Sequence, residues 1–346
     1  MNYTEFKDYV REHILENLPE KYADSNIQIE QIVKNNDCFL DGLQIGENGS
    51  NITPVISLND YFKEYEHGRS MESILQAIAE IRMDYHIPKG FDSSIVTDWE
   101  KVKDKIICKL VNTEKNEKFL KNKPFTQIED LAVIYLIILE EREASSFTVT
   151  IHNNLLDGYG IDKETLHQTA LSNMEYLMPA VFSTLQDVVK ELLIPDIAKQ
   201  FEVEEELIRG FFESMMPESG VTMYCLTNKA RVNGAACILN TKVQEKIARQ
   251  LGGDFYVIPS SIHETLIVPK TTGTDFRELE EMVQEVNVMH VSVEERLSDY
   301  MYEYNTAKHE LVRCDKVIGE NIISISGDSQ EYVNGKNNSE IGLNNG

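Results

Sequence analysis

Four residues near the end of an apolar stretch have side chains that could carry out chemistry. They lie in the run Pro259-Ser-Ser-Ile-His-Glu264 and are Ser260, Ser261, His263 and Glu264. A serine acts as a nucleophile when a base lies within hydrogen-bond reach and a third group orients that base. A hydroxyl, an imidazole and a carboxylate can take these three roles. A hydrolase-like site that uses Ser260 or Ser261 with His263 is therefore one hypothesis for this chain.

The spacing of these residues favours a structural role instead. If residues 262–268 form a strand, successive side chains alternate between its faces, so His263 and Glu264 point in opposite directions. The sequence has no Gly-x-Ser-x-Gly elbow that would raise a serine above a sheet. The alternative is a turn at Pro259-Ser260-Ser261 in which a serine hydroxyl bonds to its own backbone.

The elements around these residues predict a C-terminal ββαββ unit over 223–269. Two apolar strands are expected on either side of a turn at Asn233-Gly234, which is a strong hairpin signal. A helix follows, with Thr241 and Gln244 spaced as a capping box and Gly252-Gly253 as its end. Two more strands, over 254–258 and 262–268, would place the four candidate residues at the junction between them.

The rest of the chain predicts an α+β fold, because strands and helices do not alternate as regular βαβ units. We expect an N-terminal helix plus a small antiparallel sheet, then central helices, then the ββαββ unit with flanking helices. The expected helices cover 4–18, 59–67, 70–85, 97–121, 180–193, 196–215 and 293–305, with a further one opening at Asp162; the expected strands cover 27–33, 38–45, 52–58, 145–151 and 309–314; 128–140 fits either.

The element order predicts three regions along the chain. Residues 1–90 form an N-terminal α+β subdomain, and 97–315 form a helical plus C-terminal α+β region. Residues 316–346 are polar and rich in Gly, Asn and Ser, so we expect a disordered tail.

The charge of the chain limits its partners. The 346 residues include 33 Lys and Arg against 58 Asp and Glu, a formal net charge of −25. This charge opposes attraction to phosphate backbones and to anionic lipid surfaces. No apolar run in the sequence reaches the length needed to cross a bilayer. We therefore expect no membrane partner and no direct binding to nucleic acid.

Cofactor and metal motifs are also missing from the sequence. The five cysteines include no Cys-x-x-Cys pair, and the eight histidines include no His-x-x-x-His pair. No glycine-rich phosphate loop occurs. We expect neither a cofactor nor a metal, and we expect a cytoplasmic protein whose cysteines are buried thiols.

Several stretches of the sequence together form a recognisable pattern: Lys34-Asn-Asn36, Leu40-Asp-Gly-Leu43, Asn51-Ile-Thr-Pro54, Tyr61 and Tyr65, Leu110–Asn116, Asp130–Tyr135, Tyr256–Glu264 and Leu297–Tyr300. With them the chain resembles an uncharacterised bacterial family that is known only as a domain of unknown function. The resemblance covers most of residues 1–314. It implies a cytosolic bacterial protein with one architecture over most of the chain, and it assigns no activity and no functional residue.

Three functional hypotheses follow from the sequence. The leading one is a soluble, acidic protein that binds a protein partner and has no catalytic activity, because no complete catalytic, metal or nucleotide motif is present. The first alternative is the hydrolase-like enzyme with Ser260 or Ser261 and His263. The second alternative is an acidic decoy that engages a nucleic-acid-binding protein.

Overall fold

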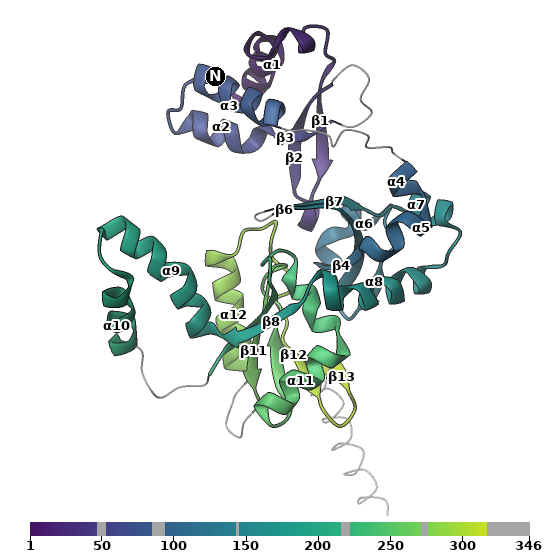
Figure 1. Cartoon of the computed structure of the whole chain (residues 1–346), viewed down its shortest axis with the longest axis vertical. Helices are drawn as coiled ribbons and strands as arrows, with labels where there is room; N and C mark the ends of the chain where they lie inside the picture. The colour runs from purple at the N-terminus through teal and green to yellow at the C-terminus, as the bar shows by residue number, and fades with distance from the viewer. Residues whose placement is uncertain (47–52, 85–93, 143–144, 216–221, 271–275, 317–346) are drawn as a thin grey trace, which may run out of the picture. The chain divides into compact units, whose positions relative to one another are not determined.

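A computed structural model describes residues 1–46, 53–84, 94–142, 145–215, 222–270 and 276–316. The sheets of the described residues are antiparallel and are accompanied by helices, which confirms the α+β class (Figure 1). The chain divides into two compact units. The first comprises 1–103, 114–123 and 152–160, and the second comprises 104–113, 124–151 and 161–346. The tail predicted to be disordered lies outside the described residues from position 317 onward.

The first unit contains a three-stranded antiparallel sheet in the order β1-β2-β3. The sequence predicted the elements of this unit as far as residue 84, apart from the extent of the first helix. Asn2 accepts a hydrogen bond from Glu5 N at 3.0 Å and completes a capping box, so the first helix begins at a sequence signal. The elements are α1 Tyr3–His13, β1 Ile27–Val33, β2 Phe39–Ile45, β3 Val55–Ser57, α2 Leu58–Glu66 and α3 Met71–Asp84.

A hydrophobic core lies between α1, α3 and the sheet of this unit. Phe6, Val10 and Ile14 recur at helical spacing and are fully buried. They share the core with Leu43 and Ile45 of β2 and with residues of α3. Four short helices complete the unit: α4 Ser94–Thr97, α5 Trp99–Val102, α6 Glu117–Leu120 and α7 Asn153–Tyr159.

The second unit begins with a four-stranded antiparallel sheet centred on β6 Leu131–Arg142. This strand pairs with β4 Ile106–Asn112, β5 Thr126–Ile128 and β7 Ser145–Thr150. The predicted helix over 97–121 is therefore wrong. Helix α8 Lys163–Leu177 and the 3-10 helix η6 Gly234–Leu239 both cover β4, so an apolar run rich in Ile and Val is buried as a strand.

A six-stranded antiparallel sheet forms the rest of the second unit, in the order β13-β12-β10-β11-β9-β8. Tyr256, Ile258, Val268 and Met301 pack in its core against Val283 of α12 Phe276–His290. The strands are β8 Ala180–Thr184, β9 Tyr224–Asn228, β10 Phe255–Ile258, β11 Thr265–Pro269, β12 Tyr302–Asn305 and β13 Glu310–Arg313.

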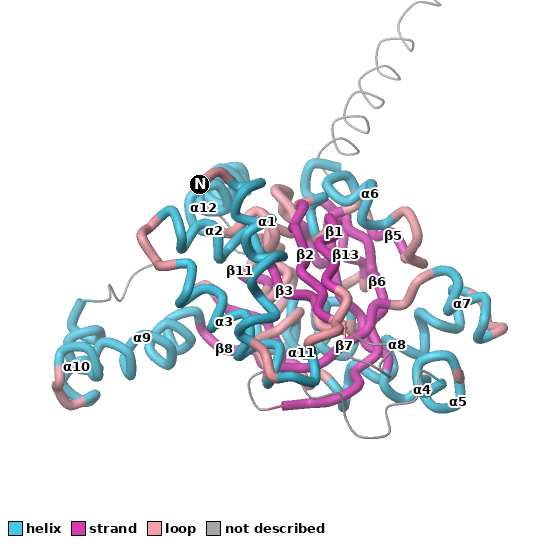
Figure 2. The backbone as a smooth tube through the Cα atoms, turned by 90° about the horizontal axis from the view of Figure 1, so that it is seen from above, coloured by secondary structure: helices cyan, strands magenta, loops and turns pink. Residues whose placement is uncertain are grey.

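Two predicted helices are wrong in part because their residues extend this sheet. The expected helix over 180–193 begins as β8, which pairs with β9, and the expected helix over 293–305 ends as β12, which pairs with β10. Helix α9 Leu185–Phe201 starts where β8 ends, and α10 Glu205–Met215 follows it. Both views show this helical hairpin leaving the strands of its own unit (Figures 1 and 2).

Candidate functional site

The junction that carries the predicted site residues is a buried loop between β10 and β11. Ser298 N donates to the Pro259 carbonyl at 2.8 Å, and Leu297 N donates to the Ser260 carbonyl at 3.0 Å. Ser260 and Ser261 are 8% and 5% exposed. Strand β11 begins at Thr265, later than the sequence predicted. His263 and Glu264 therefore precede the strand, and the alternation of side chains between strand faces does not apply to them.

The Ser261 hydroxyl takes part in a local turn. Its Oγ accepts a hydrogen bond from His263 N at 3.0 Å, which confirms the predicted serine turn. The His263 ring faces other groups: Nδ1 accepts from Asn233 N at 3.3 Å, and Nε2 lies 3.5 Å from a carboxylate oxygen of Glu295. A catalytic serine needs a hydrogen bond between its hydroxyl and an imidazole nitrogen. Among the described residues, no such bond joins Ser261 to His263.

Glu264 lies beside the same turn. Burial raises the pKa of its carboxyl, while a hydrogen bond with Ser261 and the charge of His263 act in the opposite direction. Burial, with a contribution from Glu264, also raises the pKa of the Cys225 thiol to about 11. The structure thus brings Ser261, His263 and Glu264 together. The Ser261 hydroxyl, however, bonds to the backbone amide of His263 and to the Glu264 carboxylate.

Gly234 allows the start of η6 (Gly234–Leu239) to lie close to β9 and to the junction. A Cβ at this position would lie 2.2 Å from Thr227 Oγ1, 2.5 Å from the His263 carbonyl oxygen and 2.7 Å from Asn228 N. Thr227 Oγ1 in turn donates to the His263 carbonyl at 2.8 Å. This close approach explains why the sequence has glycine here.

The predicted hairpin at Asn233-Gly234 is wrong. Strand β9 already pairs with β8 on one edge and with β11 on the other, so no edge is free for a hairpin partner. The chain instead forms the 3-10 helix η6. Helix α11 Thr241–Leu251 follows, and its N-cap is Asn240, whose side chain accepts from Lys242 N and Val243 N, so Thr241 is not the cap.

A second cluster of polar side chains surrounds Asp130, at the turn between β5 and β6. Its carboxylate accepts hydrogen bonds from Asn112 Nδ2 at 3.2 Å, from Ser298 Oγ at 2.7 Å and from the Tyr302 hydroxyl. An Arg313 guanidinium nitrogen lies 3.9 Å away. Burial and Asp130 raise the pKa of Tyr302, so the phenol remains a donor. This network links β4, the turn before β6, and β12 within one unit. We therefore assign it a structural role.

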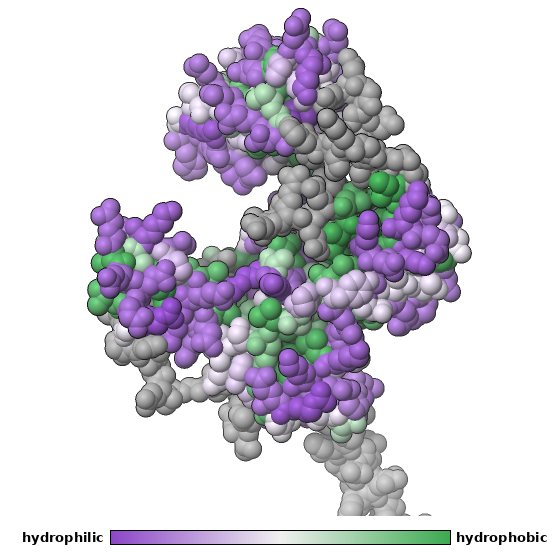
Figure 3. Space-filling model, viewed as in Figure 1, coloured by the Kyte–Doolittle hydropathy of each residue, from purple (hydrophilic) through white to green (hydrophobic). Residues whose placement is uncertain are grey.

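The turn between α9 and α10 presents apolar side chains to solvent. Phe201 is 65% exposed, Val203 39% and Leu207 67%. We call these three residues, with the exposed glutamates around them, the hairpin tip. Green apolar surface lies among purple polar surface where Figure 1 places these helices (Figure 3). The glutamates of the tip are Glu202, Glu204, Glu205 and Glu206.

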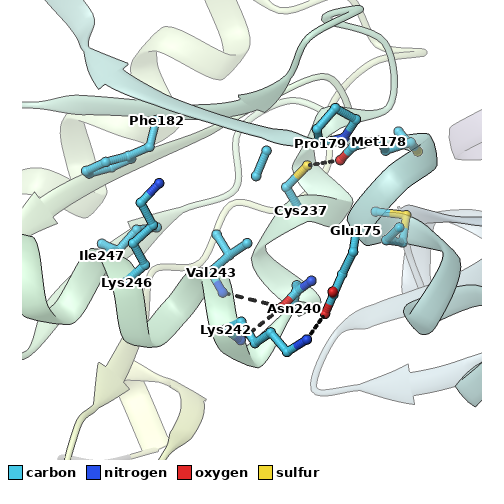
Figure 4. Close-up of a pocket in the computed structure, with 12 residues that line it drawn as sticks. Glu175, Met178, Pro179, Phe182, Cys237, Asn240, Lys242, Val243, Lys246 and Ile247 are labelled. Carbon is cyan, nitrogen blue, oxygen red and sulfur yellow. Dashed lines mark hydrogen bonds and ion pairs between the residues drawn. The ribbon is translucent and has the colours of Figure 1, made fainter.

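A pocket of about 230 Å³ lies between the end of α8, strand β8 and helix α11 (Figure 4). Its walls are apolar, with Met174, Met178, Phe182 and Ile247 among them. Charged side chains on α8 and α11 lie at its margin. Sequence reasoning missed this site because its walls come from three elements that are distant along the chain.

The described residues hold no group of three or more His, Cys, Asp or Glu side chains that could bind a metal ion. Within the same residues, no helix is both long and apolar enough to cross a bilayer. All five cysteines are free thiols, and Cys108, Cys225, Cys237 and Cys314 are buried.

The chain belongs to DUF5688, a family of unknown function whose family model matches residues 3–306. This match confirms the resemblance seen in the sequence. No curated protein and no solved structure matches the chain. The arrangement of its side chains therefore carries the functional inference.

Proposed function

We propose that this chain is a non-catalytic interaction protein that binds a basic, amphipathic segment of a partner protein through the hairpin tip. The observation that carries the proposal is an exposed apolar group, Phe201, Val203 and Leu207, set among glutamates. Exposed apolar surface with a polar rim is typical of protein interaction sites. Because the rim here is acidic, the complementary partner is basic.

Two contacts stabilise the base of the helical hairpin that carries the tip. Thr184 Oγ1 caps α9 by accepting from Asp187 N at 3.1 Å, and an ion pair of 2.7 Å joins Arg231 to Glu191 near the base of the arm. Within α9 only Ile194 and Ala198 are buried. Leu192 and Leu193 of the same helix are 52% and 44% exposed, so they are available to a partner.

The charge pattern also selects the kind of occupant. A second copy would bring like-charged glutamates together, which is unfavourable. A segment with Lys or Arg on one face of a helix and large apolar residues on the other meets both halves of the tip. We place this interaction in the cytoplasm, because free buried thiols suit a reducing compartment.

A labelled helical peptide of lysine and leucine tests the proposal by fluorescence anisotropy. We expect binding that weakens with salt, and that weakens roughly tenfold or more when Glu204, Glu205 and Glu206 are all replaced by lysine. The matched control replaces Glu278, Glu281 and Glu285 of α12 by lysine, which changes the net charge equally and should leave most of the binding intact. Equal losses in the two triple variants would contradict the proposal.

The apolar half of the tip has its own test. We expect Leu207→Asp to abolish peptide binding, because it places a charge where an apolar side chain must dock. Met289→Asp on α12 is the control, since Met289 is 65% exposed and lies outside the tip. A peptide with glutamate in place of lysine should not bind to the unmodified protein.

The hydrolase alternative has less support, because His263 faces Asn233 and Glu295. We expect a fluorophosphonate probe to leave Ser260 and Ser261 unlabelled in the folded protein. Labelling that disappears in Ser261→Ala and in His263→Ala would establish the enzyme instead. The decoy alternative would require that a DNA duplex competes with the tip for a nucleic-acid-binding partner.

A further inference from the structure

We propose that the pocket beside α11 binds a small amphiphilic carboxylate, with the apolar chain inside the pocket and the carboxylate at Lys246. This site is separate from the hairpin tip and does not depend on the proposed function. The inference rests on three observations: the size of the pocket, its apolar walls and the charges at its margin.

The size of the pocket limits its ligand. Apolar cavities of about 150 Å³ hold a benzene ring, which has six carbons. By the same proportion, a pocket of about 230 Å³ holds roughly nine non-hydrogen atoms. This is smaller than the sites of drug-sized ligands, which begin at about 300 Å³. A medium-length alkyl chain fits, and a nucleotide does not.

The walls of the pocket favour an apolar body. Met174 and Met178 are flexible, polarizable side chains that adapt to irregular ligands. Phe182 stacks on Tyr224 with ring centroids 4.9 Å apart, which fixes one side of the wall. The Cys237 thiol points to the Met178 carbonyl oxygen at 3.7 Å, and burial raises its pKa to about 12. The thiol is therefore neutral, and the pocket contains no thiolate nucleophile.

The margin of the pocket selects the charge of the ligand. Lys242 and Glu175 form an ion pair of 2.5 Å and neutralise each other. Asn240 uses its side-chain oxygen to cap α11. Lys246 is exposed, and it has no ion-pair partner among the residues that the structure describes. Figure 4 shows its side chain extending along the wall toward Phe182. The charged side chains at this margin sum to one positive charge, which suits a monocarboxylate.

Titration calorimetry with octanoate, octanol and octylammonium tests the site in the full-length protein. We expect octanoate to bind more tightly than either comparison ligand. Lys246→Gln should weaken octanoate roughly fivefold to tenfold and leave octanol unchanged, because only the carboxylate loses its partner. Arg249→Gln is the matched control, since it removes one exposed cation from the same helix outside the pocket.

A second variant tests the volume. Val243→Phe places a larger side chain in the wall, so we expect it to weaken octanoate and octanol alike. Octylammonium that binds as tightly as octanoate would overturn the proposal. So would an octanoate affinity that is unchanged in Lys246→Gln, or an absence of octanoate binding up to its micelle concentration.

Discussion

Replacement of Asp130 by alanine tests whether the buried carboxylate holds the second unit together. The side chain is 1% exposed, and it accepts hydrogen bonds from Asn112, Ser298 and Tyr302. Alanine leaves these donors without a partner in a buried site, and each such group costs about 1–3 kcal/mol. Breaking a buried charged pair costs about 3–5 kcal/mol as a whole. We expect the unfolding free energy of this unit to fall by about 4 kcal/mol.

Hydrogen exchange followed by mass spectrometry is the suitable assay, because it reports each unit separately. A loss of about 4 kcal/mol corresponds to exchange roughly several hundred times faster in the most protected amides. Peptides from β6 and β12 should show this change, while peptides from β1 and β2 of the first unit serve as an internal reference.

Two further variants grade the effect. Tyr302→Phe removes one donor and should cost about 1–2 kcal/mol. Asp315→Ala removes a carboxylate that is 43% exposed and pairs with Arg313 at 2.6 Å, so it should cost less than about 1 kcal/mol. If Asp130→Ala costs no more than Asp315→Ala, the reasoning about the buried network is refuted.

Three other local features can be tested by substitution, with thermal and chemical unfolding as the measurement. Gly234→Ala should destabilise the second unit by about 1–3 kcal/mol, because the added Cβ would clash with the backbone. Gly210→Ala, at an open helix position, should stabilise it by about 0.5–1 kcal/mol. Equal effects of the two variants would contradict the close approach at Gly234. Asn240→Ala should cost about 1 kcal/mol and Thr241→Ala much less, and the reverse order would restore Thr241 as the cap. Burial raises the pKa of Glu264, so the folded state opposes ionisation of this carboxyl. Glu264→Gln should therefore be more stable than the unmodified protein at pH 7. This gain in stability should vanish as the pH falls below about 4.3, the usual pKa of glutamate. A gain that persists at low pH would exclude this cause.

The first unit could be predicted as far as residue 84 because its signals there are local. Phe6, Val10 and Ile14 mark one helix face, and the turn at Asn35–Asp37 separates two strands that pair from Ile27 with Ile45 to Val33 with Phe39. Strand β4 could not be predicted, because an apolar run over 106–112 fits a buried helix as well as a strand. Contacts with α8 and η6, which come later in the chain, decide its conformation.

The candidate site divides in the same way. The bond of the Ser261 hydroxyl to the backbone is local turn chemistry, and the sequence predicted it. The partners of the His263 ring could not be predicted. Asn233 lies 30 residues earlier and reaches the ring where Gly234 lets η6 lie close to β9 and to the junction. The pocket likewise depends on the pairing of β8 with β9, in a stretch where the sequence predicted a helix.

The bond between Asp130 and Tyr302 also has a consequence for synthesis of the chain on the ribosome. The two residues are 172 positions apart. At about 5–20 residues per second, the tyrosine is made roughly 9–34 seconds after the aspartate. During that interval the carboxylate keeps its water, and the turn between β5 and β6 lacks its final partner. The four-stranded sheet therefore reaches its finished state only after Tyr302 has been made, and a nascent chain that stops before Tyr302 should expose this turn to chaperones and proteases.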